Sequence, residues 1–479
     1  MPSFTYSSTG LLGLSFLLSA CMVGSDYQKP NTVLPTAWVS AHAQANQDHL
    51  AIEQGWWKNF HDPVLNQLIT KATANNLDIK IAEERIAQAR AYQSAATAAL
   101  FPTGEMMANA LRQSNQIGFP SSAPSTLTSA LKKPFNIFKT GFDASWELDL
   151  FGGHRREAES AKAEFEASAL SHDDLVISLL AEVAATYIEI RQYQAQLNLA
   201  QQTVEADIKT TTITQQRVEL GEAAGVDASK TESQQQRDQA QIPYISNLLS
   251  QAEYRMDVLL GEKPGATHPF VNPLKALPSL EQKLVLTAPA SVIAQRPDIR
   301  IAERKLASAT AQEGVATAKF FPDVSLVGFI GLFNTNAGNL LNVSSKSWSM
   351  GANVLWPILS FGSLSANLSG AEARQQEALT KYQKTILSAL SDVESSLTAY
   401  TEQERYSQSV EKATAADQHV YNIAVKRYEE GLTSYLEVLE VERKLYSSQN
   451  QLTLAKAQTT RTLIGVYKSL GGGWEPVKI

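Results

Sequence analysis

Cysteine is almost missing from this sequence: Cys21 is the only one among 479 residues, so no disulfide can form within the chain. Long apolar runs are missing too, since no stretch of roughly 18 apolar residues follows the extreme N-terminus, which excludes helical membrane spans. The seven histidines are scattered without a metal-ligand spacing, and no metal site is predicted. A net charge of −7 with both signs mixed argues against a nucleic-acid partner.

Recognisable catalytic motifs are also missing. The sequence contains no Gly-rich phosphate-binding loop with a lysine, no His-Glu-x-x-His and no Gly-x-Ser-x-Gly. We therefore expect neither an enzyme nor a bound cofactor, and a cell-envelope hydrolase is disfavoured. Any energy that the process requires must come from a partner protein.

The single cysteine follows a short apolar run. The run from Leu11 to Leu18 is too short to span a bilayer and fits the apolar region of a signal peptide. The box Leu18-Ser19-Ala20-Cys21 resembles the processing site of bacterial lipoproteins, which implies cleavage before Cys21 and acylation of it. Met22 comes next and favours the outer membrane. The alternative is a buried cysteine in an uncleaved chain, and the start of the chain departs from the usual pattern because it lacks Lys and Arg.

Most of the chain is predicted to be a duplicated unit. Residues 77–83 match residues 297–303 at an offset of 220, and the match continues at an offset of 210 as far as Leu260-Gly261 and Leu470-Gly471. The predicted organisation is a signal peptide, an acylated segment, a first repeat, a linker, a second repeat and a C-terminal tail, at 1–20, 21–62, 63–276, 277–296, 297–471 and 472–479.

Each repeat is predicted to run helix, strand, loop, strand, long helix, turn, helix. Residues 154–219 and 371–430 contain no Pro or Gly and are rich in helix formers, which predicts helices of roughly 100 Å. Such lengths need lateral support from neighbouring helices. Their sparse apolar residues predict a narrow packing seam at Leu179, Val183, Tyr187, Ile190, Leu387, Val393, Leu397 and Tyr400. The alternative interpretation is a cytosolic coiled-coil rod. Pro243 lies inside the returning helix of the first repeat and is expected to bend or break that helix.

Four short strands with alternating apolar and polar residues are predicted at 104–117, 142–150, 323–332 and 347–358. Their length and period of two are typical of transmembrane β-strands, and equally of half-buried soluble strands. The connecting loops at 118–138 and 334–346 are expected on an outer face. Because a membrane barrel has to be closed and needs about eight strands, four strands per chain predict that three chains share one barrel of twelve.

Several stretches resemble the outer-membrane factor family, in its branch of NodT/OprM-type lipoproteins related to TolC. The signature runs from Gln295 to Glu303 and on through Ala318 to Pro322; Trp56-Trp57, Trp146 to Gly152 and Leu470 to Trp474 also match. The resemblance covers essentially the whole mature chain. It implies an α+β membrane protein: a homotrimer with a twelve-stranded β-barrel, continued by a long periplasmic α-helical barrel. Its function would be that of a passive duct in a tripartite efflux system, docked to a periplasmic adaptor and an inner-membrane pump of the RND type.

The resemblance also implies an aperture. Glu437 and Glu440 are three residues apart, so they share one helix face, and they match acidic positions around the closed periplasmic end of such ducts. Three copies would bring six carboxylates together, and like charges at ~6 Å in a partly dry pore repel by a few kcal/mol. Two ordinary solvated glutamates are the alternative interpretation.

A latch is implied nearby. Asp227 matches a family position in the first helical hairpin that ties to the second hairpin, and Tyr428 matches its tyrosine partner. A hydrogen bond donated by the Tyr428 hydroxyl to the Asp227 carboxylate would contribute ~1.5–3 kcal/mol. Thr433 stands where an arginine would complete a second link, which leaves that link open. Alternatively, Asp227 is simply the N-cap of the following helix.

The hairpin turns themselves are candidates for docking the adaptor. Arg217 with Gly221, and Arg427 with Gly431, have the same spacing, and Gly225 adds freedom to the first turn. Alternatively, these residues only end helices. A competing function is that of a periplasmic adaptor or scaffold built of coiled coils, but no lipoyl-like β-domain is recognisable. The sequence does not specify the exported cargo.

Overall fold

A computed structural model of the chain describes residues 22–32, 34–39, 55–114, 134–278 and 289–472. Cys21 and most of the first predicted loop lie outside these ranges. The chain divides into two compact units. The first comprises Met1–Pro30, Ala87–Glu166 and Glu303–Lys381, and the second comprises Asn31–Ile86, Ala167–Ala302 and Tyr382–Ile479. Each unit takes segments from both sequence repeats, so the units are not the repeats.

The order of elements is the one predicted for a duplicated chain. The first half contains η1 (Trp56–Phe60), α2 (Pro63–Asn75), α3 (Leu77–Ala98), β1 (Thr103–Gln113), β2 (Phe135–Glu147), α5 (Gly153–Glu219), α6 (Gly225–Leu259) and α7 (His268–Val271). The second half contains α8 (Pro289–Gln295), α9 (Pro297–Ala318), β3 (Asp323–Asn334), η2 (Ala337–Asn339), η3 (Val343–Ser345), β4 (Lys346–Leu355), α10 (Phe361–Glu429) and α11 (Tyr435–Ser469). Helix, strand, strand, long helix and returning helix therefore follow one another twice.

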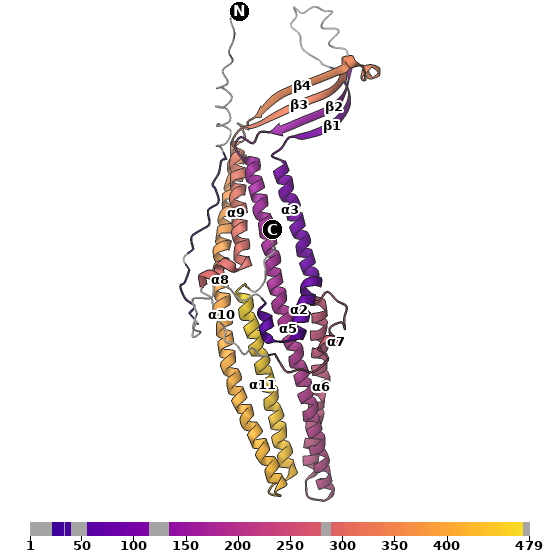
Figure 1. The fold of residues 1–479 in the computed structure, drawn as a ribbon, viewed down its shortest axis with the longest axis vertical. Coiled ribbons are helices and arrows are strands. Elements are labelled where there is room, and N and C mark those ends of the chain that lie inside the picture. The colour runs from indigo at the N-terminus through magenta and orange to yellow at the C-terminus, as the bar shows by residue number, and fades with distance from the viewer. Residues whose placement is uncertain (1–21, 33, 40–54, 115–133, 279–288, 473–479) are drawn as a thin grey trace, which may run out of the picture. The chain divides into compact units, whose positions relative to one another are not determined.

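The four strands form one antiparallel sheet in the order β1-β2-β3-β4, which is curved in Figure 1. The β2–β3 pairing joins the two repeats, with Phe138 opposite Asn334. Several predicted strand boundaries were wrong. Strand β1 ends at Gln113 rather than at residue 117, and β2 ends at Glu147 rather than at residue 150. Strand β2 begins at Phe135, inside the predicted loop, because its first residues pair with β1 as far as Gln113. Strand β4 ends at Leu355 rather than at residue 358.

The two long helices are confirmed. Helix α5 has 67 residues and α10 has 69. Helix α10 begins ten residues before the predicted start and includes Gly362 and Gly370, whose cost in a helix of this length is only about 1 kcal/mol each. Pro243 does not break α6, which is continuous around it. No helix of the described ranges combines the length and the apolar character that crossing a membrane requires.

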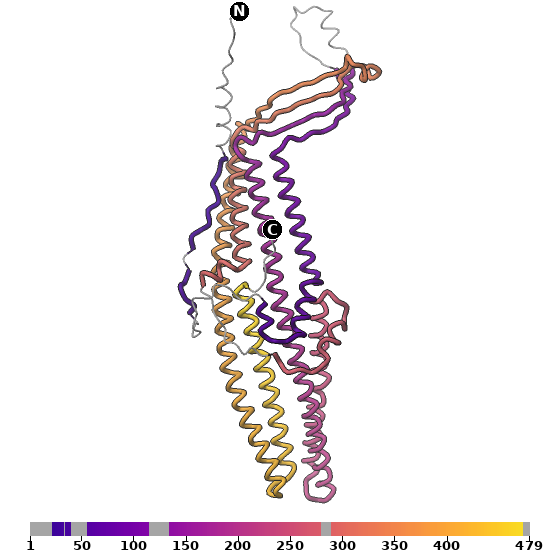
Figure 2. Tube along the Cα trace, viewed as in Figure 1, coloured from indigo at the N-terminus to yellow at the C-terminus, as the bar shows by residue number. Residues whose placement is uncertain are grey.

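Each long helix forms a hairpin with the helix that follows it. Figure 2 shows the traces of α5 and α6, and of α10 and α11, each joined by a tight turn. Arg255 on α6 contacts Glu189 on α5, and Lys456 on α11 contacts Glu411 on α10. These exposed ion pairs contribute little, so the hairpins rely on their apolar seams.

Six of the eight predicted seam residues are buried, Tyr400 is partly buried and Leu387 is exposed. Of the predicted residues, Leu179, Val183, Tyr187, Ile190, Val393 and Leu397 are buried. The prediction for Leu387 was wrong, because 68% of its surface is exposed. The buried positions of α10 run through Ile386, Ala389 and Val393, at the three- and four-residue spacing of one helix face. Leu387 lies next to this face rather than on it.

A buried polar network holds the core of the second unit. The Tyr187 hydroxyl donates to Asp62 at 2.6 Å and accepts from Arg191 Nε at 2.9 Å. Asp62 also caps α2 by accepting from the Val64 amide. Arg191 is completely buried and also donates to the Val271 carbonyl at 2.9 Å. Breaking such a pair on one side is costly because it leaves an uncompensated buried charge.

Candidate functional site

The sheet has two chemically different faces. Successive side chains of a strand point to opposite faces, and the register pairs even with even and odd with odd residues across all four strands. On the even-numbered face, eight large apolar side chains are exposed: Met106, Phe142, Trp146, Leu326, Ile330, Trp348, Met350 and Val354. Its charged residues, Arg112 and Lys346, both lie at the loop ends of their strands.

The odd-numbered face is mixed: Leu111, Val327, Phe333 and Leu355 are exposed on it beside its polar residues. It contains every acidic residue of the four strands, namely Glu105, Asp143, Glu147 and Asp323, together with Asn109, Lys139, Ser325, Ser347, Ser349 and Asn353. Lys139 Nζ lies 3.5 Å from the Asp143 carboxylate and 3.8 Å from the centre of the Phe329 ring. Phe329 lies over two glycines paired across β2 and β3, Gly141 and Gly331, where a Cβ atom would collide with its ring.

Exposed aromatic residues gather where the strands meet the helices. The Trp146 indole N–H donates to the Leu100 carbonyl at 3.0 Å, and Trp356 donates to Phe320 at 3.1 Å. These two tryptophans are equivalent in the two repeats. A ring that is exposed while its N–H group is paired suits the boundary between lipid and water, where barrels carry aromatic girdles.

The segment that follows Cys21 in the sequence is fixed at the same junction. Met22 packs against Gly152, just beyond the end of β2. Arg156, which is 1% exposed, donates to the carbonyls of Val23 and Gly24 at 3.2 and 3.1 Å. Sequence reasoning missed Arg156, because one of two adjacent arginines at the start of a long helix carries no signal that it binds a segment about 130 residues earlier.

The two hairpin turns share one backbone conformation. Gly221 and Gly431 both have a φ of 74°, in the left-handed region that glycine adopts without strain. In each turn the carbonyl of the arginine, Arg217 or Arg427, accepts a bond of 2.8 Å from the residue after the glycine. The predicted turns are therefore present. Gly225, by contrast, is the first residue of α6.

The two predicted latch residues have other partners within one chain. Asp227 lies in the first turn of α6, 3.7 Å from Lys230 Nζ. It is not the N-cap, which is Ala224 in an extended conformation, so the alternative interpretation was wrong. Tyr428 is 45% exposed and its ring centre lies 5.1 Å from that of Tyr435. Across the described ranges no hydrogen bond joins Asp227 to Tyr428 in the single chain.

The predicted aperture residues lie at the start of α11. The Glu437 carboxylate lies 3.8 Å from Arg427 and accepts a hydrogen bond from the Thr433 hydroxyl. Ser434 caps the helix by accepting from the Glu437 amide. Glu440, one helical turn further on, is exposed and lines a groove. The Thr433 hydroxyl thus bonds to Glu437 within the same turn. Position 433 is the one at which the family resemblance implied an arginine.

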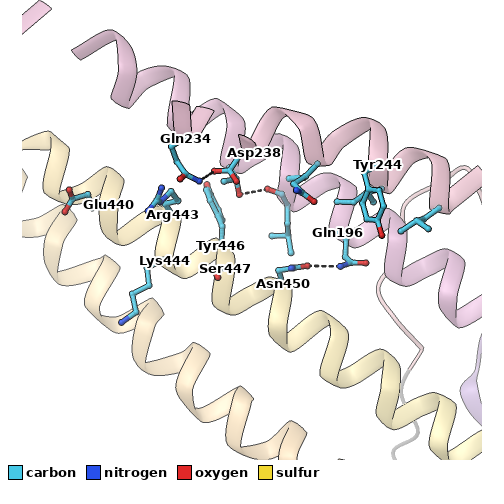
Figure 3. A pocket seen from close by; sticks show the side chains of 16 residues that line it. Gln196, Gln234, Asp238, Tyr244, Glu440, Arg443, Lys444, Tyr446, Ser447 and Asn450 are labelled. Atoms are coloured by element: carbon cyan, nitrogen blue, oxygen red, sulfur yellow. Dashed lines mark hydrogen bonds between the residues drawn. The ribbon is translucent and has the colours of Figure 1, made fainter. Parts of the chain in front are cut away.

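The groove lies in the second unit among α5, α6 and α11 and has a volume of 680 Å³ (Figure 3). Its walls are mostly polar. Gln234 donates to Asp238 at 2.8 Å along α6, and Gln196 on α5 donates to Asn450 on α11 at 3.1 Å. Arg443 lines the groove from α11. Sequence reasoning missed this groove, because its residues come from three separate helices.

Sequence comparison places this arrangement in a family. The profile described as "Outer membrane efflux protein" matches twice, at residues 68–262 and 288–472, which follow the two repeats. The chain belongs to the outer membrane efflux protein family. Nodulation protein T of Rhizobium leguminosarum is 30% identical over 468 residues, covering 97% of each chain. The probable efflux pump outer membrane protein TtgC of Pseudomonas putida is 29% identical over 473 residues, covering 98% of this chain and 96% of TtgC.

Solved structures of outer membrane efflux proteins have the same fold. The outer-membrane channel OprN is 31% identical, covers 95% of this chain and all of its own, and superposes with a TM-score of 0.84. The Campylobacter jejuni CmeC channel shares the fold, with a TM-score of 0.84 at 22% identity and 96% coverage of both chains. The predicted family, the fold with four strands per chain, and the function as an outer-membrane component of an efflux system are confirmed.

Proposed function

We propose that this chain is one third of a passive outer-membrane duct, in which three copies close a barrel of twelve strands. The separation of the two sheet faces supports this proposal most strongly. An apolar exposed face opposite a mixed face that holds all the acidic residues of the strands is the pattern of a barrel wall between lipid and water. Among the described residues no strand pairs with the outer edges of β1 and β4, and lipid offers their backbone groups no partner, so neighbouring chains have to pair with them.

In this arrangement the even-numbered face contacts lipid and the odd-numbered face lines the passage. The acidic residues and Lys139 then lie in the water-filled interior. Trp146 and Trp356 mark the boundary on the periplasmic side, and Arg112 and Lys346 lie near the opposite boundary. The duct requires no catalytic step, since the chain only encloses a path that other proteins energise.

We infer that Cys21 carries the lipid anchor in the outer membrane. Arg156 holds Val23 and Gly24 close to the end of β2. Acyl chains attached there would enter the periplasmic leaflet without the segment being displaced. Two or more chains make such anchoring stable, at about 0.8 kcal/mol for each buried CH₂ group.

The helical hairpins extend into the periplasm and carry the docking turns. Relatives include outer-membrane proteins of toluene, solvent and antibiotic efflux pumps. We therefore propose a periplasmic adaptor and an inner-membrane pump of the RND type as partners. The adaptor would contact the turns built around Arg217, Gly221, Gly225, Arg427 and Gly431, whose exposed residues leave them accessible.

At the periplasmic end, three copies of Glu437 and Glu440 would surround a narrow aperture. For the latch to form, the Asp227 carboxylate has to leave Lys230 and bond to the hydroxyl of Tyr428, in the same chain or in a neighbouring one. We predict that Asp227→Ala or Tyr428→Phe raises the single-channel conductance in planar bilayers, since each removes a bond of ~1.5–3 kcal/mol from the closed state. Conductance equal to that of the wild type in both variants would exclude the latch.

The barrel is tested by placing the same charge on each face. Ile330→Arg puts a guanidinium on the exposed apolar face, and Ser349→Arg puts it on the other face of the neighbouring strand. At mid-membrane the first should cost about 2–4 kcal/mol per chain, and three copies should abolish the trimer. We expect the second to leave a heat-labile trimer in outer-membrane extracts with altered conductance. A soluble wild-type monomer, or equal tolerance of both variants, would contradict the duct.

A further inference from the structure

One aromatic side chain is buried on the odd-numbered face of the sheet. Phe329 is 8% exposed and is the only buried residue of the four strands, all of which the structure describes. Its ring lies over Gly141 of β2 and Gly331 of β3, which are opposite each other in the register. A Cβ atom at these glycines would lie 2.9 and 2.7 Å from carbons of the ring. The glycine pair therefore leaves the space in which the ring approaches the backbone of two strands.

The ammonium group of Lys139 covers this ring. Lys139 Nζ lies 3.8 Å from the ring centre of Phe329 and 3.5 Å from the carboxylate of Asp143, four residues further along β2. The negative face of an aromatic ring attracts a cation, and the carboxylate adds a charge of opposite sign. Glycine backbone, ring and ammonium thus form three layers, which we call the Lys139–Phe329 stack. The stack fixes the position of a charge that a flexible lysine stem would otherwise leave to solvent.

Lys139 differs in sign and in place from the other charges of the odd-numbered face. It is the only basic residue on this face of the four strands. Glu105 and Asp143 are opposite each other on its helix side, and the two other acids of the face lie nearer still to the helices. The residues opposite Lys139 are Asn109 and Phe333, which carry no charge. The face therefore changes from acidic to basic along the strands, from the helices toward the loops.

We propose that Lys139 determines the ion selectivity of the barrel, as a fixed positive charge that opposes the cation preference of the acids. This inference rests on the proposed duct, because only a closed barrel makes the odd-numbered face the wall of a passage. With one such lysine and four such acids per chain, a trimer holds three ammonium groups at one level and twelve carboxylates between that level and the helices. Charges that line a passage change the local concentration of ions. Phe329 acts through Lys139 and is a positioning residue.

The reversal potential of the purified trimer across a KCl gradient in planar bilayers measures this role. Lys139→Gln removes three positive charges and should raise the ratio of K⁺ to Cl⁻ permeability about twofold or more at ~0.01 M salt, where a charge acts over ~30 Å. At about 1 M salt the range falls to about 3 Å and the difference should nearly vanish. Lys139→Arg should retain the wild-type ratio, because a guanidinium also stacks on a ring and pairs with a carboxylate.

Two controls separate charge from face and from position. Lys346→Gln removes the same charge from the even-numbered face of the same sheet and should leave the permeability ratio unchanged. Phe329→Leu keeps every charge and removes the ring. We expect it to raise the ratio by less than Lys139→Gln does, because the ammonium loses its fixed position, whereas Phe329→Tyr keeps a ring and should restore the wild-type ratio. A ring that only filled the space over the glycines would not move the ratio.

The outcomes distinguish this inference from the duct on which it rests. Equal permeability ratios for the wild type and Lys139→Gln at low salt, in trimers that conduct, would overturn the role of Lys139 and leave the duct intact. Equal shifts in Lys139→Gln and Lys346→Gln would overturn it too, since the effect would not depend on the face. If Lys139→Gln does not assemble, Lys139→Met keeps an unbranched stem over the ring and gives the same test. A wild-type chain that forms no conducting trimer would contradict the duct, and this inference with it.

Discussion

The two hairpin turns have the same backbone and different charges. At the repeat offset of 210, Glu437 and Glu440 of the second hairpin correspond to Asp227 and Lys230 of the first. The first turn thus carries an acid and a base in contact at 3.7 Å, whereas the second carries two acids. Duplication preserved the conformation that makes a turn, while the side chains diverged. The excess of negative charge is consequently larger at the second turn, where residues 427–440 carry four acids and one base, against three acids and two bases in residues 217–230.

The largest effect is expected from neutralising the acidic residues of the second turn. We predict that Glu437→Gln combined with Glu440→Gln weakens block by multivalent cations in planar bilayers by about tenfold or more, equivalent to about 1.4 kcal/mol, because three copies lose six carboxylates. Glu219→Gln combined with Glu222→Gln removes the same charge from the first turn and should leave block nearly unchanged. An equal loss of cation block in both double variants would show that the charges of the two turns do not differ in their effect.

The next effect concerns the backbone that the turns share. Gly221→Ala and Gly431→Ala should each cost about 1–2 kcal/mol in unfolding free energy, because both positions are left-handed while a methyl group meets no other atom. Gly225→Ala is the control: it has an ordinary helical backbone in equally open space and should be slightly stabilising. Chemical denaturation measures all three. Unequal costs at Gly221 and Gly431 would show that the turns differ in conformation.

The smallest effect concerns helix capping. Ser434 caps α11 with its side chain, whereas its counterpart Ala224 precedes α6 without a side-chain cap. Ser434→Ala should cost about 1 kcal/mol, and Ala224→Ser should recover a similar or smaller amount. Hydrogen exchange of the first amides of each helix reports the change locally. No gain from Ala224→Ser would mean that the backbone there does not present its amides to a cap.

Periodicity was sufficient to predict the helices and strands. A stretch without Pro or Gly predicted α5 to within one residue, and alternation predicted four strands. Boundaries that depend on a partner strand were wrong: β2 begins at Phe135 because β1 pairs with it there, although its own sequence reads as loop. Leu387 was wrong because a helix residue is buried only if a neighbour covers its side.

The residues of the candidate site also divide into those that local sequence predicted and those that depend on distant parts of the chain. The turn glycines and the acidic pair of α11 are local patterns, so the sequence and its family resemblance pointed to them. Arg156, whose partners lie about 130 residues away, was not predicted. Neither was the groove, whose lining comes from three helices that are far apart in the sequence.

Local sequence thus settled which segments are helix or strand and where the chain repeats, because backbone hydrogen bonding and side-chain period act over a few neighbouring residues. Packing alone decided which polar groups lose water. Asp62 and Tyr187 are 125 residues apart, and they form a buried hydrogen bond only once the start of α2 packs against α5. Desolvation depends on what covers a group, and that cover comes from elsewhere in the chain.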